Sequence, residues 1–307
     1  MVTLREQSAT TGRTWPEYPF RGNRLDLDGL GLHYLDEGAG PPVVMVHGNP
    51  TWSYYYRRLV LALRDRYRCI VPDHIGCGYS DKPDDLHYDY HFDRRASDLG
   101  ALIDRVAPSD PVTLVVHDWG GMIGLRWATR NPDRVRRFVV LNTGAFHLPA
   151  AKRFPLGLAL SRTPHLGALL VRGLNLFALG ASYVGCKRRN LEDAIRDAYV
   201  SPYRSWADRR AVHRFVQDIP LAPSDRGYAI VGEVADGLAR FAEHPMQIHW
   251  GLKDFVFDRH FLAEWQRRFP KAETHAYDDA GHYVLEDAPE RVIPAVRRFL
   301  EQTDRSA

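Results

Sequence analysis

Short apolar runs alternate with amphipathic stretches along most of this 307-residue chain. Residues 24–28 alternate between polar and apolar, as an edge strand does, whereas residues 42–46 are apolar throughout, as in a strand buried on both faces. Strands alternating with helices predict an α/β fold with a mainly parallel sheet covered on both faces. The predicted strands are 24–28, 32–35, 42–46, 68–71, 112–116, 137–141, 246–250 and 273–277, and the predicted helices of the first half are 52–63 (with Thr51 as N-cap), 96–106 and 122–128.

The alternation stops between residues 145 and 223, where no strand pattern occurs and helices are predicted over 166–184, 191–198 and near 208–217. This segment follows a strand that ends at Asn142. In open α/β sheets ligands bind beyond the carboxyl ends of the strands, so the segment reads as a helical lid over that edge. Packing of its apolar helix on the core is the alternative. The expected division is core 1–146, lid 147–222 and core 223–307.

Residues 115–121, Val-Val-His-Asp-Trp-Gly-Gly, join a buried strand directly to a helix. Such a corner is sharp, and Gly120 and Gly121 allow the helix to pack close against the strand. Asp118 stands at the corner, where a nucleophile projects from the sheet edge. The alternative is that Asp118 caps the helix that starts at Trp119.

A carboxylate that attacks carbon forms an ester, which a base and water, or another route, must clear. His282 follows the last predicted strand in a glycine-containing loop, where the chain order nucleophile, acid, histidine places a base. His117 would point away from Asp118 on a strand and reads as a packing or orienting residue. His87 and His91 are four residues apart but lack the glutamate of a zinc helix, so no metal site is expected.

The histidine needs an acid to orient it, and two strand ends could supply one. The first holds Asn142, which cannot carry the charge. The second is followed by Asp254, with Asp258 four residues later. Asp254 lies nearer the strand end and is preferred, with Asp258 as the alternative.

Donors for a departing anion are expected in two places. Asn49, in the loop 47–50, offers amide N–H groups, and Trp119 offers a backbone and an indole N–H. For Trp119 the alternative is core packing, because tryptophan is large and mostly buried. Two neutral donors that converge beside Asp118 would suit a leaving anion.

Composition narrows the function classes. The 41 basic and 38 acidic residues nearly balance, giving a net charge of +3, and no basic block stands out, so nucleic-acid binding is not expected. Cys69, Cys77 and Cys186 form no Cys-x-x-Cys pair, and residues 1–20 hold no apolar signal core, which together favour the cytoplasm. Residues 166–185 are interrupted by Arg172 and Asn175, which argues against a membrane span.

The motifs His-Gly-Asn-Pro-Thr-Trp (47–52), His-Asp-Trp-Gly-Gly (117–121), Gly-Leu-Lys-Asp (251–254) and Gly-His-Tyr (281–283) resemble the haloalkane dehalogenase branch of the α/β-hydrolases from about residue 24 to 300. The resemblance implies Asp118 as nucleophile, His282 as base and Asp254 as its acid. It implies Asn49 and Trp119 as halide ligands, and no cofactor. Epoxide hydrolases share the Asp corner and use lid tyrosines, for which Tyr203 could be offered, but they usually carry an aromatic residue at the position of Asn49.

Three further motifs, 73–78, 214–220 and 254–258, resemble the β-lactone decarboxylases of bacterial long-chain olefin biosynthesis. That likeness implies conversion of a cis-dialkyl β-lactone with long alkyl chains to a cis-alkene and carbon dioxide. It also implies work beside other enzymes of the pathway in large assemblies, with a homo-oligomer as another option. We rank this activity first and dehalogenation second. A hydrolase fold kept only for binding ranks last, because every catalytic position is chemically competent.

Overall fold

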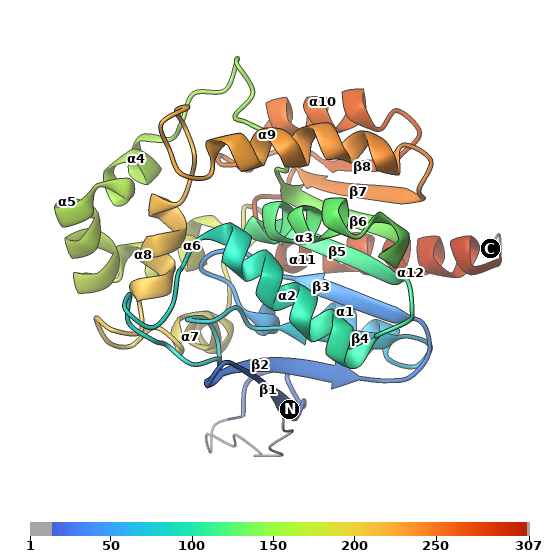
Figure 1. The fold of residues 1–307 in the computed structure, drawn as a ribbon, viewed down its shortest axis with the longest axis horizontal. Helices are drawn as coiled ribbons and strands as arrows, with labels where there is room; N and C mark the ends of the chain where they lie inside the picture. Colours follow the sequence, from blue (N-terminus) through green and yellow to red (C-terminus); the bar gives the residue numbers. More distant parts are fainter. Residues whose placement is uncertain (1–13, 306–307) are drawn as a thin grey trace.

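The computed structural model describes residues 14–305 and is organised around one eight-stranded sheet (Figure 1). The strand order is β1-β2-β4-β3-β5-β6-β7-β8, with antiparallel pairing of β1 to β2 and of β2 to β4 and parallel pairing elsewhere. The mainly parallel sheet and all eight predicted strands are therefore confirmed. The strands are β1 Gly22–Leu27, β2 Leu30–Glu37, β3 Pro42–Val46, β4 Arg68–Pro72, β5 Val112–Asp118, β6 Val135–Thr143, β7 Met246–Gly251 and β8 Glu273–Tyr277.

Helices cover both faces of the sheet. Consecutive strand residues point to opposite sides, and both sides of the central strands are apolar, so each face must be buried. In β3, Val44 and Val46 pack into a core with α2, α3, α9 and α10, while Val43 and Met45 pack into a second core with α1, α11 and α12. The helices are α1 Arg57–Leu63, α2 Phe92–Val106, α3 Trp119–Arg130, α4 Leu156–Arg162, α5 Pro164–Ala168, α6 Leu176–Val184, α7 Asp193–Val200, α8 Arg210–Gln217, α9 Tyr228–Gly237, α10 Arg259–Arg268, α11 Val284–Asp287 and α12 Pro289–Arg305, with 3-10 turns η1 Ser53–Tyr56, η2 Pro132–Arg134 and η4 Leu238–Phe241 and a π-helical turn η3 Leu169–Gly173.

Helices α4 to α8, here called the inserted helices, lie between β6 and β7 in the chain and gather at one end of the molecule (Figure 1). The helix predicted over 166–184 is wrong in one respect: it is broken between η3 and α6. Asn175 has a φ of 55°, a left-handed conformation that an α-helix cannot contain. Helix α4 lacks a sequence prediction, since its seven residues are too short for a clear helical period.

The predicted N-cap Thr51 is also wrong. The first helical turn begins at Ser53, after Trp52, and carries no side-chain cap. The Thr51 hydroxyl instead accepts a hydrogen bond from the Gly48 N–H, at 3.2 Å, and so holds the loop after β3. The cap position cannot be read from the local pattern because this hydroxyl satisfies the loop rather than the helix.

No single helix of residues 14–305 has the length and apolarity to span a bilayer. Pro164–Gly173 and Leu176–Val184 pass that test only together, by length and composition, and they are bent by 66°. The sequence predicts no signal core in residues 1–20, and residues 1–13 of that segment lie outside the described residues.

Candidate active site

Asp118 occupies a strained corner between β5 and α3. Its φ of 52° and ψ of −127° are unfavourable for a residue with a Cβ, and such strain persists where the surroundings hold it. A Cβ on Gly120 would lie 1.9 Å from the Val46 carbonyl oxygen, so only glycine allows α3 to approach β3 this closely. The Thr143 hydroxyl donates to the Asp118 carbonyl and fastens the corner to β6.

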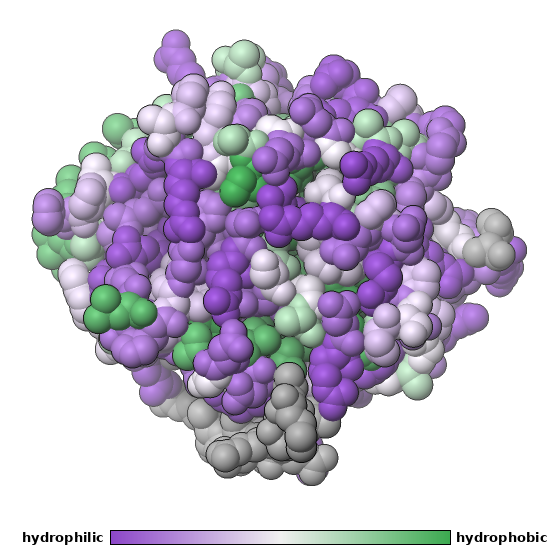
Figure 2. All heavy atoms as spheres, in the orientation of Figure 1, coloured by the Kyte–Doolittle hydropathy of each residue, from purple (hydrophilic) through white to green (hydrophobic). Residues whose placement is uncertain are grey.

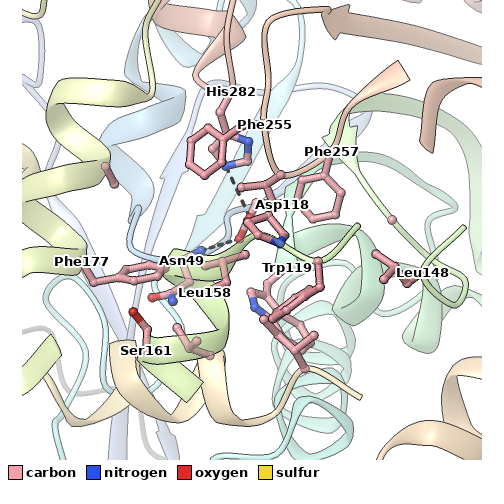
Figure 3. Close-up of a pocket in the computed structure, with 18 of the residues that line it drawn as sticks. Asn49, Asp118, Trp119, Leu148, Leu158, Ser161, Phe177, Phe255, Phe257 and His282 are labelled. Atoms are coloured by element: carbon pink, nitrogen blue, oxygen red, sulfur yellow. Dashed lines mark hydrogen bonds and ion pairs between the residues drawn. The ribbon is translucent and has the colours of Figure 1, made fainter. Parts of the chain in front are cut away.

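The Asp118 side chain does not cap α3. Its Oδ1 accepts a hydrogen bond from the backbone N–H of Asn49 at 2.7 Å, and its Oδ2 lies 3.4 Å from His282 Nε2. Figure 3 shows the carboxylate between these two residues. Burial raises the pKa of Asp118, but the hydrogen bond and charge of His282 outweigh it and hold that pKa below its usual value. The group is therefore ionised and aimed into the site, as a nucleophile must be.

His282 is held between two carboxylates. Its Nδ1 lies 2.7 Å from Asp254 Oδ2 on the side away from Asp118. Burial disfavours its charged form, but Asp254 and then Asp118 outweigh burial and raise the pKa of His282 to about 10. The charged form of His282 is therefore favoured in the resting site. Phe257 stacks on the ring with centroids 5.9 Å apart, which restricts its orientation.

His117 contacts the backbone of His282. It belongs to the opposite face of β5, where its ring stacks on Tyr55 with centroids 4.3 Å apart. Burial lowers the pKa of His117 to about 3, so the ring is neutral, and its Nε2 lies 2.9 Å from the His282 carbonyl oxygen. A neutral donor at that carbonyl fixes the backbone that carries the base, in agreement with the orienting role expected from sequence.

Asn49 and Trp119 both border the cavity in front of Asp118. One amide hydrogen of Asn49 is directed to the Val212 carbonyl oxygen, 3.1 Å from Nδ2, which leaves the second hydrogen for a ligand. The Trp119 ring packs against Phe92 and Phe215, with centroids 6.0 and 5.6 Å away, and its indole N–H has no protein acceptor within residues 14–305. Two neutral donors therefore face the space beside the nucleophile.

The cavity itself has a volume of about 540 Å³ and is closed on one side by the inserted helices. Its walls are mostly aliphatic and aromatic, and the labelled Leu148, Leu158, Phe177 and Phe255 surround Asp118 and His282 in Figure 3. Away from the site, Ser161 and His147 are the polar side chains among its lining residues. Such a space suits an apolar substrate with a polar reacting centre.

The model of the α/β-hydrolase fold family matches residues 41–289. The chain belongs to this family. Among the relatives of this α/β-hydrolase, the cis-3-alkyl-4-alkyloxetan-2-one decarboxylase of Shewanella oneidensis is 55% identical, covering 94% of this chain and 91% of that protein. The protein of the same name from Xanthomonas campestris is 49% identical, covering 94% and 99%.

Haloalkane dehalogenases are more distant relatives of this α/β-hydrolase. The structure of haloalkane dehalogenase DatA from Agrobacterium tumefaciens superposes with a TM-score of 0.83, at 26% identity, and covers 92% of this chain and 96% of that one. The fold class and the family resemblance inferred from the motifs are therefore confirmed.

The alternatives weighed from sequence lie elsewhere in this α/β-hydrolase. Asp258 caps α10 through the His260 N–H and pairs with Lys152 at 3.0 Å, so it does not reach His282. Tyr203 is fully buried, donates to the Thr51 carbonyl at 3.4 Å and does not line the cavity. No tyrosine of residues 14–305 is among the residues that line the cavity.

The paired histidines considered for a metal have separate surroundings. His87 lies 2.5 Å from the Asp84 carboxylate, while His91 caps α2 by accepting from the Asp93 N–H. Their spacing in the sequence thus does not place them on one helix face, because α2 begins only at Phe92.

Asn142 is the site residue that the sequence did not assign. Its Nδ2 donates to Asp254 Oδ2 at 3.0 Å, and its side chain also bridges to the backbone of Gly251 at 2.8 and 3.1 Å. It therefore ties β6 to β7 and holds the acid in place. Its position at the end of a strand is the sequence signal for this role, which an amide can fill because orienting a carboxylate needs a donor and not a charge.

Proposed function

We propose that this protein is a β-lactone decarboxylase that converts cis-3-alkyl-4-alkyloxetan-2-ones into cis-alkenes and carbon dioxide. The observation that carries the proposal is the match along nearly the whole chain to two proteins of that name. The site geometry supports it, because an ionised Asp118 faces an apolar cavity with two N–H donors beside it. The small hydrophobic substrate would place its long alkyl arms against the cavity walls.

In the proposed first step, Asp118 attacks the saturated ring carbon that is bonded to the ring oxygen, C4 of the oxetan-2-one, and not the carbonyl carbon. A carbon–oxygen bond to Asp118 forms as the ring carbon–oxygen bond breaks, and the released electron pair makes the ring oxygen part of a free carboxylate. Asn49 Nδ2 and Trp119 Nε1 donate to that new carboxylate. Donors placed in advance lower the barrier because they need no reorganisation during the reaction.

In the second step, the bond between the new carboxylate and the adjacent ring carbon breaks and carbon dioxide leaves. Its electron pair forms the alkene, and the bond to Asp118 breaks to restore the aspartate. Inversion at the attacked carbon followed by anti elimination carries a cis ring into a cis alkene. The charged His282, oriented by Asp254, donates to the departing aspartate, so neither water nor a cofactor takes part.

Haloalkane dehalogenation is the second candidate, and the shared fold of DatA favours it. There, halide would leave toward Asn49 and Trp119, and a water activated by His282 would hydrolyse the ester on Asp118. In that ester Asp118 no longer carries its charge, so the pKa of His282 in the resting site does not distinguish the two routes. We rank decarboxylation first because the two relatives of that name match nearly the whole chain at 55% and 49% identity.

The wider setting is also proposed. Residues 147–222 act as a lid over the cavity, within a core formed by 1–146 and 223–307. The three cysteines are free and buried, which suits a reducing compartment such as the cytoplasm. Assembly with other enzymes of the same pathway, or self-association, stays a prediction from the resemblance.

The experiment is turnover of a cis-dialkyl β-lactone in oxygen-18 water, followed by mass spectrometry of the peptide that contains Asp118. We expect cis-alkene and no heavy oxygen on Asp118, because no water attacks the ester. The same enzyme with a bromoalkane gives labelled Asp118, and Asp118→Asn gives neither alkene nor label. Brisk halide release from short bromoalkanes with no alkene from the lactone would reverse the ranking.

A further inference from the structure

The outer surface of the inserted helices carries a group of exposed apolar side chains, here called the apolar face. Leu156 is 74% exposed, and Tyr183 is 55% exposed. Figure 2 shows apolar residues along the left rim of the molecule, where α4 and α5 lie in Figure 1. Isolated exposed leucines are ordinary, but nine exposed apolar side chains within residues 156–184 are a concentration that is typical of a binding surface. The apolar face consists of Leu156, Leu160, Leu166, Leu169, Leu174, Leu176, Leu179, Tyr183 and Val184.

The apolar face is continuous with the active-site cavity. Leu160, Leu176 and Val184 are exposed at the surface and also line the cavity. Phe255, in the loop after β7, does the same and is 46% exposed. The cavity therefore opens through the apolar face, and whatever covers this face also covers the entrance to the site.

The segment that carries the apolar face is rich in basic residues, although three of them, Lys152, Arg162 and Arg188, pair with Asp258, Asp225 and Asp279 of other segments. Residues 147–191 contain seven Lys and Arg and no Asp or Glu, although the whole chain is nearly balanced. Arg153 precedes α4, and residues 187–189, Lys-Arg-Arg, follow α6, so basic side chains stand at both ends of the apolar stretch. The side chains of Arg153, Lys187 and Arg189 have no acidic partner within residues 14–305.

We propose that the apolar face docks on an anionic phospholipid bilayer. Apolar helix faces enter the boundary between headgroups and acyl chains, while lysine and arginine at their edges bind anionic headgroups. The 66° bend between Pro164–Gly173 and Leu176–Val184 means that the two segments do not form one straight helix. A second copy of the chain fits less well, since two apolar faces in contact would bring Lys187 and Arg189 of each copy toward like charge.

Docking gives the cavity direct access to the hydrocarbon phase. A long-chain lactone and the alkene made from it are insoluble in water, so exchange through the apolar face avoids an aqueous passage. This consequence rests on the proposed function, whereas the docking itself does not. Vesicle binding without substrate therefore tests the docking independently of turnover.

The experiment is flotation of the purified protein with vesicles of phosphatidylcholine, with and without phosphatidylglycerol. We expect binding to the anionic vesicles to be at least about tenfold stronger and to weaken as salt is raised. The triple variant Leu156→Gln, Leu169→Gln, Leu179→Gln should lose at least about tenfold in binding. None of these leucines lines the cavity. The matched control is Leu86→Gln, since Leu86 is 92% exposed but lies outside the inserted helices.

The role of the basic side chains beside the apolar face is tested with the double variant Lys187→Gln, Arg189→Gln, which should reduce binding to anionic vesicles only. The control is the double variant Arg105→Gln, Arg298→Gln. It removes the same number of positive charges from α2 and α12, which lie outside the inserted helices. Circular dichroism and thermal melting verify that each variant folds. Absence of binding to both vesicle types, or equal binding by the triple variant, would overturn the proposal. A dimer in sedimentation that the triple variant dissolves would assign the apolar face to a second copy instead.

Discussion

Asp118 is held by main-chain geometry more than by its neighbours' side chains. A backbone N–H from Asn49 fixes one carboxylate oxygen, and the strained φ of 52° turns the side chain out of the sheet. The other oxygen faces His282 at 3.4 Å. Since the carboxylate makes no cap to α3, its position serves the cavity and not the stability of the helix.

Removing either donor beside Asp118 should slow the reaction without unfolding the protein. We expect Asn49→Ala and Trp119→Phe each to lower kcat by on the order of 10²-fold, as loss of an oxyanion donor does. Steady-state kinetics with a β-lactone measures this. Asn131→Ala and Trp127→Phe are matched controls: Asn131 also bonds a backbone carbonyl, Trp127 is buried in the same helix as Trp119, and neither lines the cavity. If both Asn49→Ala and Trp119→Phe kept the rate of the wild type, these two residues would not bind the leaving group.

The charge on His282 should link stability to pH. Its pKa is about 10 in the folded protein and about 6.5 in the unfolded chain. A pKa that is raised on folding stabilises fully below pH 6.5, and that stabilisation is lost as pH rises through about 10. We therefore expect the free energy of unfolding of the wild type, minus that of His282→Gln, to fall between pH 7 and pH 10. Urea unfolding of both proteins at these pH values measures it, and a constant difference would contradict the ion-pair arrangement.

Among the elements, the inserted helices set the shape of the cavity. Helix α4 turns Leu158 into the cavity and Leu156 to the outside, so one short helix has both a substrate face and a surface face. The break at Asn175 redirects the chain so that α6 can contribute Phe177 from another side. A straight helix over 166–184 would not close the space in this way.

The alkyl-chain length that the enzyme prefers should change when residues on the cavity face of α4 are substituted, but not when residues on its outer face are. Each buried methylene contributes about 0.8 kcal/mol, so kcat/KM should rise about fourfold per added carbon until the cavity is filled. Leu158→Trp fills part of the cavity and should shorten the preferred chain, while Leu156→Trp, on the outer face, should leave it unchanged. A series of β-lactones with increasing alkyl length measures both. A flat response to length would mean that the alkyl chains do not enter the cavity.

At the scale of the whole molecule, the sheet order assembles the site. The adjacent strands β3, β5, β6, β7 and β8 are parallel, so their carboxyl ends meet at one edge. Each is followed by, or ends in, one residue of the site, in the order Asn49, Asp118, Asn142, Asp254 and His282. The two apolar cores on either side keep these strand ends in register. The order and direction of the strands therefore bring the proposed site residues together, while the sequence motifs supply their side chains.

The sequence by itself determined the elements whose signals are local. A short, fully apolar run such as 42–46 favours a buried strand, and the glycines after Asp118 allow a close strand-to-helix corner, so the α/β class and the position of the nucleophile candidate could be predicted from period and steric size. The family resemblance followed from the motifs around these same positions.

Only the tertiary structure decided what depends on contacts between distant segments. Spacing from the strand end favours Asp254 but leaves Asp258 open, whereas the bond from Asn142, more than a hundred residues away, and the approach of His282 distinguish them. The broken helix at Asn175 and the exposure of the apolar face likewise depend on how the inserted helices pack on the core. Hydrophobic periodicity reports that a residue is apolar, but burial against the core, the cavity or the solvent is settled by the three-dimensional neighbours.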